Sequence, residues 1–118
     1  MSTKVLVVCG GNTCRSPMAE GMAASLARTA GIPDGCISVA SAGVSAYDGE
    51  PASQNAVAAM AELGIDISAH RSRRLTPELI DDADLVLTME QRHLEAVIKM
   101  TPAARTRVRL LADDDIAD

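Results

Sequence analysis

The sequence predicts one α/β domain, residues 1–118, built on an open sheet of parallel strands that alternate with helices. Short apolar runs without polar alternation are typical of strands covered on both faces, and amphipathic segments separate these runs along the chain. The 118 residues include no Trp, no Phe and one Tyr, so aliphatic side chains, Met and Ala must form the core. Such a sheet has right-handed crossovers and binds ligands beyond the carboxyl ends of its strands.

The first element is a buried strand, and a long helix follows it. Residues 5–9 carry no polar side chain and are predicted as the central strand of the sheet. Ser16 and Pro17 are typical of an N-cap and a first helical residue. The helix is predicted to run to about Ala30, where Gly31 ends it. Its apolar face is predicted to contain Met18, Met22 and Leu26.

The middle of the chain predicts a second strand, a polar loop and a second helix. Residues 36–40 form the second strand, and we expect the Cys36 side chain in the core. Residues 45–51 are polar and contain glycine, which indicates a loop. The helix that follows begins at about Ala52. One of its faces is predicted to hold Val57, Met60, Ala61 and Gly64.

The remaining segments predict a short helix, a strand, a helix and a last strand. Residues 76–79 repeat the N-cap and proline pattern of a helix start, and residues 85–87 form a third buried strand. An amphipathic helix is predicted after Glu90, with His93 on its exposed polar side. Residues 108–111 form the last strand, which the internal Arg109 places near an edge of the sheet.

Charge and composition exclude several function classes. Eleven Lys and Arg against sixteen Asp and Glu give a net charge of −5, which opposes broad binding to nucleic acid or to anionic lipid. Tyr47 is the single aromatic residue and cannot form a base-stacking platform alone. The longest apolar run near the start is far too short for a signal sequence or a membrane span. We therefore expect a cytoplasmic protein without nucleic-acid or membrane partners.

The three cysteines do not predict a structural role. Their odd number and the absence of a CxxC pair oppose both a disulfide framework and a zinc site. A histidine metal site has no support in the sequence, and we expect neither a metal nor a cofactor. Reactive chemistry at one cysteine is the more useful hypothesis.

The segment between the first strand and the first helix, residues 9–16, predicts an anion-binding loop. Its backbone N–H groups can point inward at a helix N-terminus, and Gly10 and Gly11 permit the close approach and unusual dihedrals that this needs. Cys9 stands at the mouth of the loop. The helix dipole and Arg15 both favour its thiolate, which is a nucleophile toward a bound phosphorus atom.

The spacing Cys-x5-Arg lets the loop circle a tetrahedral anion and return a guanidinium beside the sulfur. Arg15 can then clamp two phosphoryl oxygens as negative charge spreads in the transition state. Ser16 can donate its hydroxyl to the thiolate, and Asn12 can hold the loop in shape through hydrogen bonds. The loop therefore combines a nucleophile with its electrostatic stabiliser.

At this point the sequence closely resembles the low-molecular-weight protein tyrosine phosphatase family. The resemblance rests on the CGGNTCRSP loop and on three later stretches, residues 41–43, 69–72 and 83–89. It implies a four-stranded parallel sheet in the order 2-1-3-4, flanked by helices, with the phosphate-binding loop after the first strand. It also implies hydrolysis of phosphomonoesters without metal, through a phosphocysteine intermediate.

The resemblance assigns a role to each residue of the motif. Cys9 is the nucleophile and Arg15 the phosphate clamp, while Asn12 and Ser16 support them. Cys14 matches the second loop cysteine of the family, which can form a disulfide with Cys9 and shield it from irreversible oxidation. Asp118 matches the general acid, which lies in an Asp-Pro motif in the family. The family continues through a loop and a final helix, which this sequence lacks because it stops at Asp118: either it is a fragment of a longer protein, or it is a truncated protein with a poorly held acid.

The loop and its surroundings indicate a phosphorylated protein substrate, with phosphotyrosine as the first choice. Thr13 resembles the arginine phosphatase branch of the family, and this keeps phosphoarginine as an alternative. Tyr47 could stack on either group, and Gly10 leaves the pocket wall wider than the bulkier residue usual in the family. The substrate-binding set therefore contains Gly10, Gly11, Asn12, Thr13, Cys14, Ser16 and Tyr47. A local basic patch, His70, Arg71, Arg73 and Arg74, could attract the substrate protein.

Three other functions compete with protein dephosphorylation. An arsenate reductase of the same fold needs further redox cysteines near the third strand, and residues 82–90 contain none. A cysteine phosphocarrier must retain its phosphoryl group, whereas Arg15 and Asp118 favour hydrolysis. A phosphate-binding module without catalysis would bind oxyanions and lack turnover.

Overall fold

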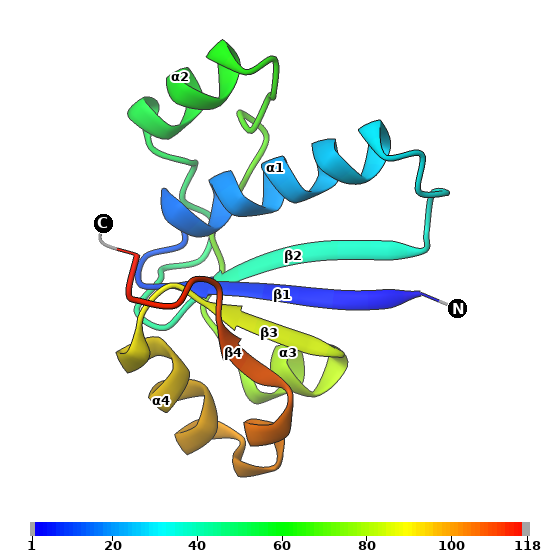
Figure 1. Cartoon of the computed structure of the whole chain (residues 1–118). Helices are drawn as coiled ribbons and strands as arrows, with labels where there is room; N and C mark the ends of the chain where they lie inside the picture. Colours follow the sequence, from blue (N-terminus) through cyan, green and yellow to red (C-terminus); the bar gives the residue numbers. More distant parts are fainter. Residues whose placement is uncertain (1, 117–118) are drawn as a thin grey trace.

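A four-stranded parallel sheet lies at the centre of the protein, and this confirms the predicted fold class. The computed structural model describes residues 2–116. The strands are β1 (Thr3–Cys9), β2 (Ile37–Gly43), β3 (Leu85–Thr88) and β4 (Val108–Leu110). They follow the order β2-β1-β3-β4, all parallel, so β1 is a central strand as predicted (Figure 1).

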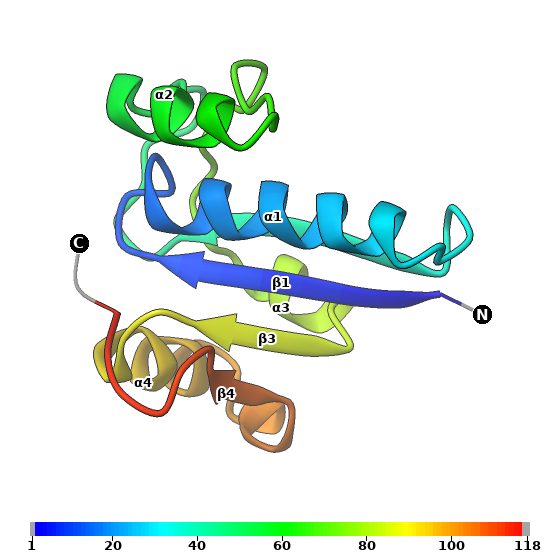
Figure 2. The ribbon, with the colours of Figure 1, turned by 45° about the horizontal axis from the view of Figure 1, so that its top comes forward.

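Helices cover both faces of this sheet. The elements α1 (Arg15–Thr29) and α2 (Gln54–Glu62) lie on one side. The elements α3 (Pro77–Asp82), α4 (Gln91–Met100) and the 3-10 helix η1 (Pro102–Thr106) lie on the other (Figures 1 and 2). None of the helices within residues 2–116 is both long enough and apolar enough to cross a bilayer.

Two core clusters lie on the two faces of the sheet, because neighbouring side chains of a strand point to opposite faces. A third cluster lies under α2 and contains Ala52, Ala56, Met60 and Ile67. Leu6 and Val8 of β1 pack in the larger cluster with Ile80, Val86 and Val97, on the side of α3 and α4. The intervening residues of β1 pack in a second cluster on the α1 side, which contains Val7, Cys9 and Met89. Both faces of β1 are therefore covered, as its continuous apolar run predicts.

The start of α1 differs from the prediction. The N-cap is Cys14 and the helix begins at Arg15, so Ser16 and Pro17 lie inside its first turn. Ser16 does not cap the helix because its hydroxyl is bonded to the Cys9 side chain instead. The predicted end is confirmed, with Ala30 as the C-cap and Gly31 at a φ of 75°.

The predicted apolar face of α1 is only partly correct. Met18 packs against the cluster under α2, but Met22 is 38% exposed and Leu26 is 69% exposed. The helix turns alanines, including Ala19 and Ala23, toward an apolar hollow of about 380 Å³ beside the sheet. Alanine side chains do not fill the space between helix and sheet, and Leu26 lies at the rim of that hollow.

The predicted positions of Cys36 and His93 are wrong, the start of α2 is shifted, and the edge position of Arg109 is confirmed. Cys36 is exposed: it precedes β2, and the first two residues of that strand, Ile37 and Ser38, are exposed as well. His93 is completely buried, and its ring accepts a hydrogen bond from the backbone N–H of Glu90, the N-cap residue of α4. α2 begins two residues later than expected, with Ser53 as its N-cap. Arg109 is exposed on the edge strand β4, as predicted.

Candidate active site

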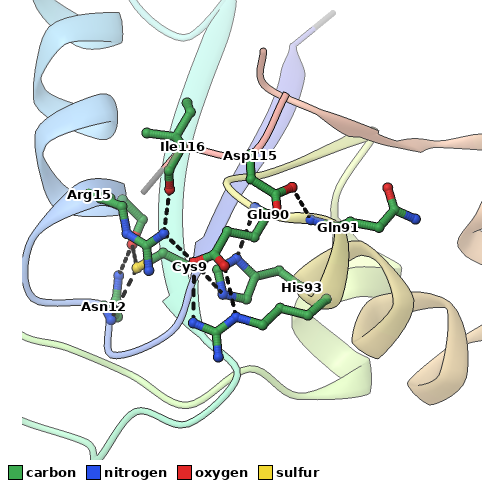
Figure 3. A network of polar contacts seen from close by, with 10 residues as sticks. Cys9, Asn12, Arg15, Glu90, Gln91, His93, Asp115 and Ile116 are labelled. Atoms are coloured by element: carbon green, nitrogen blue, oxygen red, sulfur yellow. Dashed lines mark hydrogen bonds and ion pairs between the residues drawn. The ribbon is translucent and has the colours of Figure 1, made fainter. Parts of the chain in front are cut away.

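The predicted anion-binding loop lies at the carboxyl end of β1, where the chain turns into α1 (Figures 1 and 3). Cys9 ends the strand and its side chain is 2% exposed. The segment 10–14 leads from it to Arg15, the first residue of α1, which is 7% exposed. The structure therefore brings the two ends of the Cys-x5-Arg motif together at the edge of the sheet where α/β proteins bind ligands.

Two donors surround the sulfur of Cys9. The Ser16 hydroxyl lies 2.9 Å from Cys9 Sγ, and the backbone N–H of Asn12 donates to the same atom at 3.3 Å. Both contacts are buried, so the loop itself fixes the position of the sulfur.

Asn12 holds the shape of the loop. It is the one non-glycine residue at positive φ within the described part of the chain, with a φ of 57°. Its side-chain amide donates to Ser16 Oγ at 2.8 Å, and its Oδ1 accepts from the backbone N–H of Arg73 at 2.9 Å. The His70 ring nitrogen Nε2 lies 2.8 Å from the Asn12 carbonyl oxygen and can donate to it. Asn12 thereby ties the loop to the segment of residues 70–73.

The segment after β2 holds the loop through backbone hydrogen bonds. The backbone N–H groups of Val44 and Ser45 donate to the carbonyl oxygens of Cys9 and Gly10, at 3.0 Å and 2.9 Å. A Cβ atom at Gly43 would collide with the carbonyl oxygen of Gly10, so only glycine allows this approach. The N-cap residue of α2, Ser53, donates its N–H to the Thr13 carbonyl at 2.7 Å. Thr13 is half-buried and Gly11 is exposed.

Glu90 is part of the site and was missed by the sequence analysis. Its Oε2 lies 2.6 Å from Arg15 Nη1, and the carbonyl oxygen of Ile116 lies 2.6 Å from the same nitrogen (Figure 3). Its Oε1 accepts from the Nε of Arg92 at 3.0 Å. Hydrogen bonds from Arg92 and Arg15 lower the pKa of Glu90 from 4.5 to about 2. Glu90 is therefore ionised at neutral pH and forms an ion pair with Arg15.

His93 holds Glu90 from the first turn of α4. Glu90 is the N-cap of this helix, and its backbone N–H donates to His93 Nδ1 at 3.2 Å. Burial lowers the pKa of His93, so the ring is neutral at pH 7. The signal that could have found this pair is the spacing Glu-x-x-His directly after a buried strand, where an acidic N-cap and an N3 side chain bond each other reciprocally.

The peripheral residues of the prediction have more varied positions. Tyr47 is 78% exposed, and its carbonyl oxygen accepts from the Ser72 hydroxyl. Cys14 packs against the apolar cluster under α2. Of the basic patch, Arg71 and Arg74 are exposed, whereas His70 and Arg73 contact Asn12 and are half-buried. Asp118 lies outside the described residues. Substrate contacts of Tyr47, the redox role of Cys14 and the acid role of Asp118 stay predictions.

The family model that describes the low molecular weight phosphotyrosine protein phosphatases matches residues 4–116. This match covers nearly the whole chain, including the loop and the Glu90–His93 pair. The chain belongs to this family. The predicted recognition is therefore confirmed, and so is the assignment of this phosphatase to the hydrolases.

Relatives of this phosphatase include enzymes named for two different substrates. The Probable low molecular weight protein-tyrosine-phosphatase EpsP of Ralstonia nicotianae is 43% identical, over 100% of this chain and 79% of the relative. The Protein-arginine-phosphatase of Geobacillus stearothermophilus is 40% identical, over 100% of this chain and 79% of the relative. A solved YwlE arginine phosphatase mutant, with a phosphorylated active-site serine in place of cysteine, has a TM-score of 0.91 at 36% identity and covers 98% of this chain and 78% of its own.

The buried His93 makes the stability of this phosphatase depend on pH. Burial lowers the pKa of His93 in the folded protein below 6.5, its value in the unfolded chain. As pH falls below 6.5, the unfolded chain therefore binds a proton at His93 before the folded protein does. The free energy of unfolding is therefore expected to decrease between pH 7 and pH 5. The variant His93→Asn keeps an acceptor for the Glu90 N–H and removes the titrating ring. The free energy of unfolding of this variant, measured with urea, should change less over this pH range than that of the wild type. Equal changes in both proteins would show that His93 is not the cause of the pH dependence.

Proposed function

We propose that the protein hydrolyses phosphorylated protein side chains, with Cys9 as the nucleophile and Arg15 as the phosphate clamp. The observation that carries this proposal is the Cys9 sulfur, which is hydrogen-bonded to the Asn12 N–H and the Ser16 hydroxyl inside a loop that ends at Arg15. A guanidinium and several backbone N–H groups at the start of α1 suit the charge of a phosphoryl group. The matching family and the relatives are named as phosphatases of phosphorylated proteins, which agrees with this reaction.

The reaction has two steps, which share one acid–base residue. In the first, the Cys9 thiolate attacks phosphorus in line, so the S–P bond forms while the bond from phosphorus to the side-chain oxygen or nitrogen breaks. Asp118 gives a proton to that leaving atom. In the second step, Asp118 takes a proton from water, the water oxygen bonds to phosphorus, and the S–P bond breaks. Inorganic phosphate leaves, and the Ser16 hydroxyl stabilises the returning thiolate.

The assignment of Asp118 comes from the family motif. The described chain supports it through Ile116, two residues earlier, whose carbonyl oxygen contacts Arg15 and whose N–H donates to the Met89 carbonyl at 2.7 Å. These bonds hold the segment before Asp118 across the carboxyl ends of β1 and β3. Ile116 therefore contacts the guanidinium that the proposed reaction uses, and the family motif assigns the acid two residues further along the chain.

Phosphotyrosine is the proposed substrate class, and phosphoarginine is the second candidate. The family model and the EpsP relative carry the name of tyrosine phosphatases. Thr13 favours the alternative, because its hydroxyl lies in the loop and could hydrogen-bond a polar leaving group. The exposed Tyr47 can stack on a phenol ring or on a guanidinium plane and so does not separate the two.

Matched phosphotyrosine and phosphoarginine peptides test this proposal. We expect kcat/KM to be at least tenfold higher for phosphotyrosine, which is a difference of about 1.4 kcal/mol in transition-state stabilisation. Thr13→Val, which keeps the side-chain shape and removes the hydroxyl, should leave that preference unchanged. A preference for phosphoarginine that is lost in Thr13→Val would make Thr13 the specificity residue and overturn the first choice. Tight phosphate binding without turnover of either peptide would overturn hydrolysis itself.

The proposed location is the cytoplasm. The proposed reaction needs the free thiolate of Cys9, and all three cysteines of the structure are free. Thiols persist in reducing compartments and form disulfides in oxidising ones. A phosphorylated protein in the same compartment is the proposed partner.

A further inference from the structure

A carboxylate lies against the guanidinium that the proposed function uses to bind phosphate. Glu90 Oε2 is 2.6 Å from Arg15 Nη1, and the two side chains are 17% and 7% exposed (Figure 3). A negative charge at this distance reduces the positive potential of the anion site. Because the pair is largely shielded from water, solvent weakens this effect only in part. On electrostatic grounds alone, Glu90 should weaken the binding of a phosphate ion.

The same contact restricts the orientation of Arg15. An arginine side chain has many rotamers, and each bond that fixes it lowers the entropic cost of ordering it later. The Glu90 carboxylate and the Ile116 carbonyl both contact the Nη1 atom, from two different segments of the chain. Two acceptors on one nitrogen define the plane in which the guanidinium lies.

Glu90 itself is held firmly by its backbone. The preceding residue, Met89, donates its N–H to the Val8 carbonyl of β1 at 3.0 Å, one residue before Cys9. The Glu90 N–H donates to Nδ1 of His93, a ring with 0% exposure. Because Nδ1 accepts this bond, the proton of the neutral ring is on Nε2, which lies 3.8 Å from Glu90 Oε2. The carboxylate is therefore fixed relative to the strand that carries the nucleophile.

We propose that Glu90 is a positioning residue for catalysis, which orients the Arg15 guanidinium toward the transition state at the expense of ground-state phosphate affinity. His93 supports it by holding its backbone at the start of α4. This inference rests on the proposed function, because it assigns a role to a neighbour of the phosphate clamp. Differential stabilisation of this kind raises kcat, whereas tighter binding of phosphate alone does not.

The variant Glu90→Gln removes the charge and keeps an amide oxygen that can accept bonds. A misplacement of about 1 Å in a catalytic group can cost about 10²-fold in rate, so we expect kcat to fall by about that factor. Vanadate, which adopts the five-coordinate geometry of the transition state, should inhibit more weakly in the same proportion. The inhibition constant of inorganic phosphate should stay the same or decrease, because the opposing charge is gone.

Two further variants separate orientation from general damage. Glu95→Gln removes an exposed carboxylate from the same helix, α4, and should leave kcat unchanged, since the bond from Glu90 to Arg15 remains. Glu90→Asp restores the charge with a shorter side chain and should recover part of the lost kcat. Loss of phosphate and vanadate affinity by equal factors in Glu90→Gln would indicate a structural role and overturn the proposal. An unchanged kcat would overturn it as well.

Failure of the proposed function gives a different result. If the wild-type protein turns over no phosphopeptide, calorimetric binding of phosphate and vanadate still compares the two proteins. A selective loss of vanadate affinity in Glu90→Gln would then support the positioning role of Glu90 even though hydrolysis is absent. Equal affinities of both anions for both proteins would overturn that role.

Discussion

Replacing Cys9 with serine is expected to reduce turnover on the order of 10⁶-fold, the scale of loss seen when a hydrolase with a covalent mechanism loses its nucleophile. A hydroxyl is a far weaker nucleophile than a thiolate at neutral pH, and the donors around Cys9 Sγ stabilise a thiolate rather than an alkoxide. Arg15 and the backbone of the loop are unchanged in this variant. Phosphate and vanadate should therefore still bind, with dissociation constants close to those of the wild type.

The measurement is kcat on a phosphopeptide beside titration calorimetry with both anions. Cys36→Ser provides the matched control, because Cys36 is exposed and lies before β2, away from the loop. That control should keep the wild-type kcat. Turnover of Cys9→Ser near the wild-type rate would disprove the nucleophile assignment.

Replacing Arg15 with lysine is expected to reduce kcat/KM by about 10³–10⁵-fold, the range assigned to arginines that stabilise phosphoryl transfer. A lysine keeps the positive charge, but its single ammonium group cannot clamp two phosphoryl oxygens as a planar guanidinium does. It also cannot keep the present contacts to Glu90 and Ile116 together with a bidentate clamp. The loss should therefore appear in the chemical step as well as in binding.

Steady-state kinetics and vanadate inhibition check this prediction. Arg71→Lys is the matched control, because the Arg71 side chain is exposed and donates to the neighbouring His70 carbonyl. Its kcat/KM should remain within a few-fold of the wild type. If Arg15→Lys retained wild-type inhibition by vanadate, the guanidinium would not be the clamp.

The fold was predictable because its signals are local. The apolar run that became β1 and the glycine after α1 each act within a few residues of themselves. The edge position of β4 followed from one exposed arginine. The loop was predictable for the same reason, since Cys9 and Arg15 are separated by only five residues and the loop between them determines how they lie. The start of α1 was predicted two residues too late, because Ser16 contacts Cys9 within the loop instead of capping the helix.

The part of the site that could not be predicted depends on tertiary contacts. Glu90 and Arg15 are 75 residues apart, and no periodicity connects them. His93 has a polar side chain on an amphipathic helix, which by itself indicates exposure. It is buried where its ring accepts the N–H of the N-cap residue and approaches Gly10 of the loop. Cys36 was assigned to the core because cysteine is commonly buried. It is exposed instead, next to the exposed first residues of β2.

The bonds around the loop also bear on how the protein folds. They join residues far apart in the chain: Asn12 to Arg73 over 61 positions, Arg15 to Glu90 over 75, and Arg15 to Ile116 over 101. Contacts at such separations carry a large entropy cost of loop closure and form after local helices. A chain emerging from the ribosome can build β1 and α1 early, yet it cannot orient Arg15 until residue 116 has been synthesised. The orientation of Arg15 is thus a late event in folding, which follows the synthesis of its partners at residues 90 and 116.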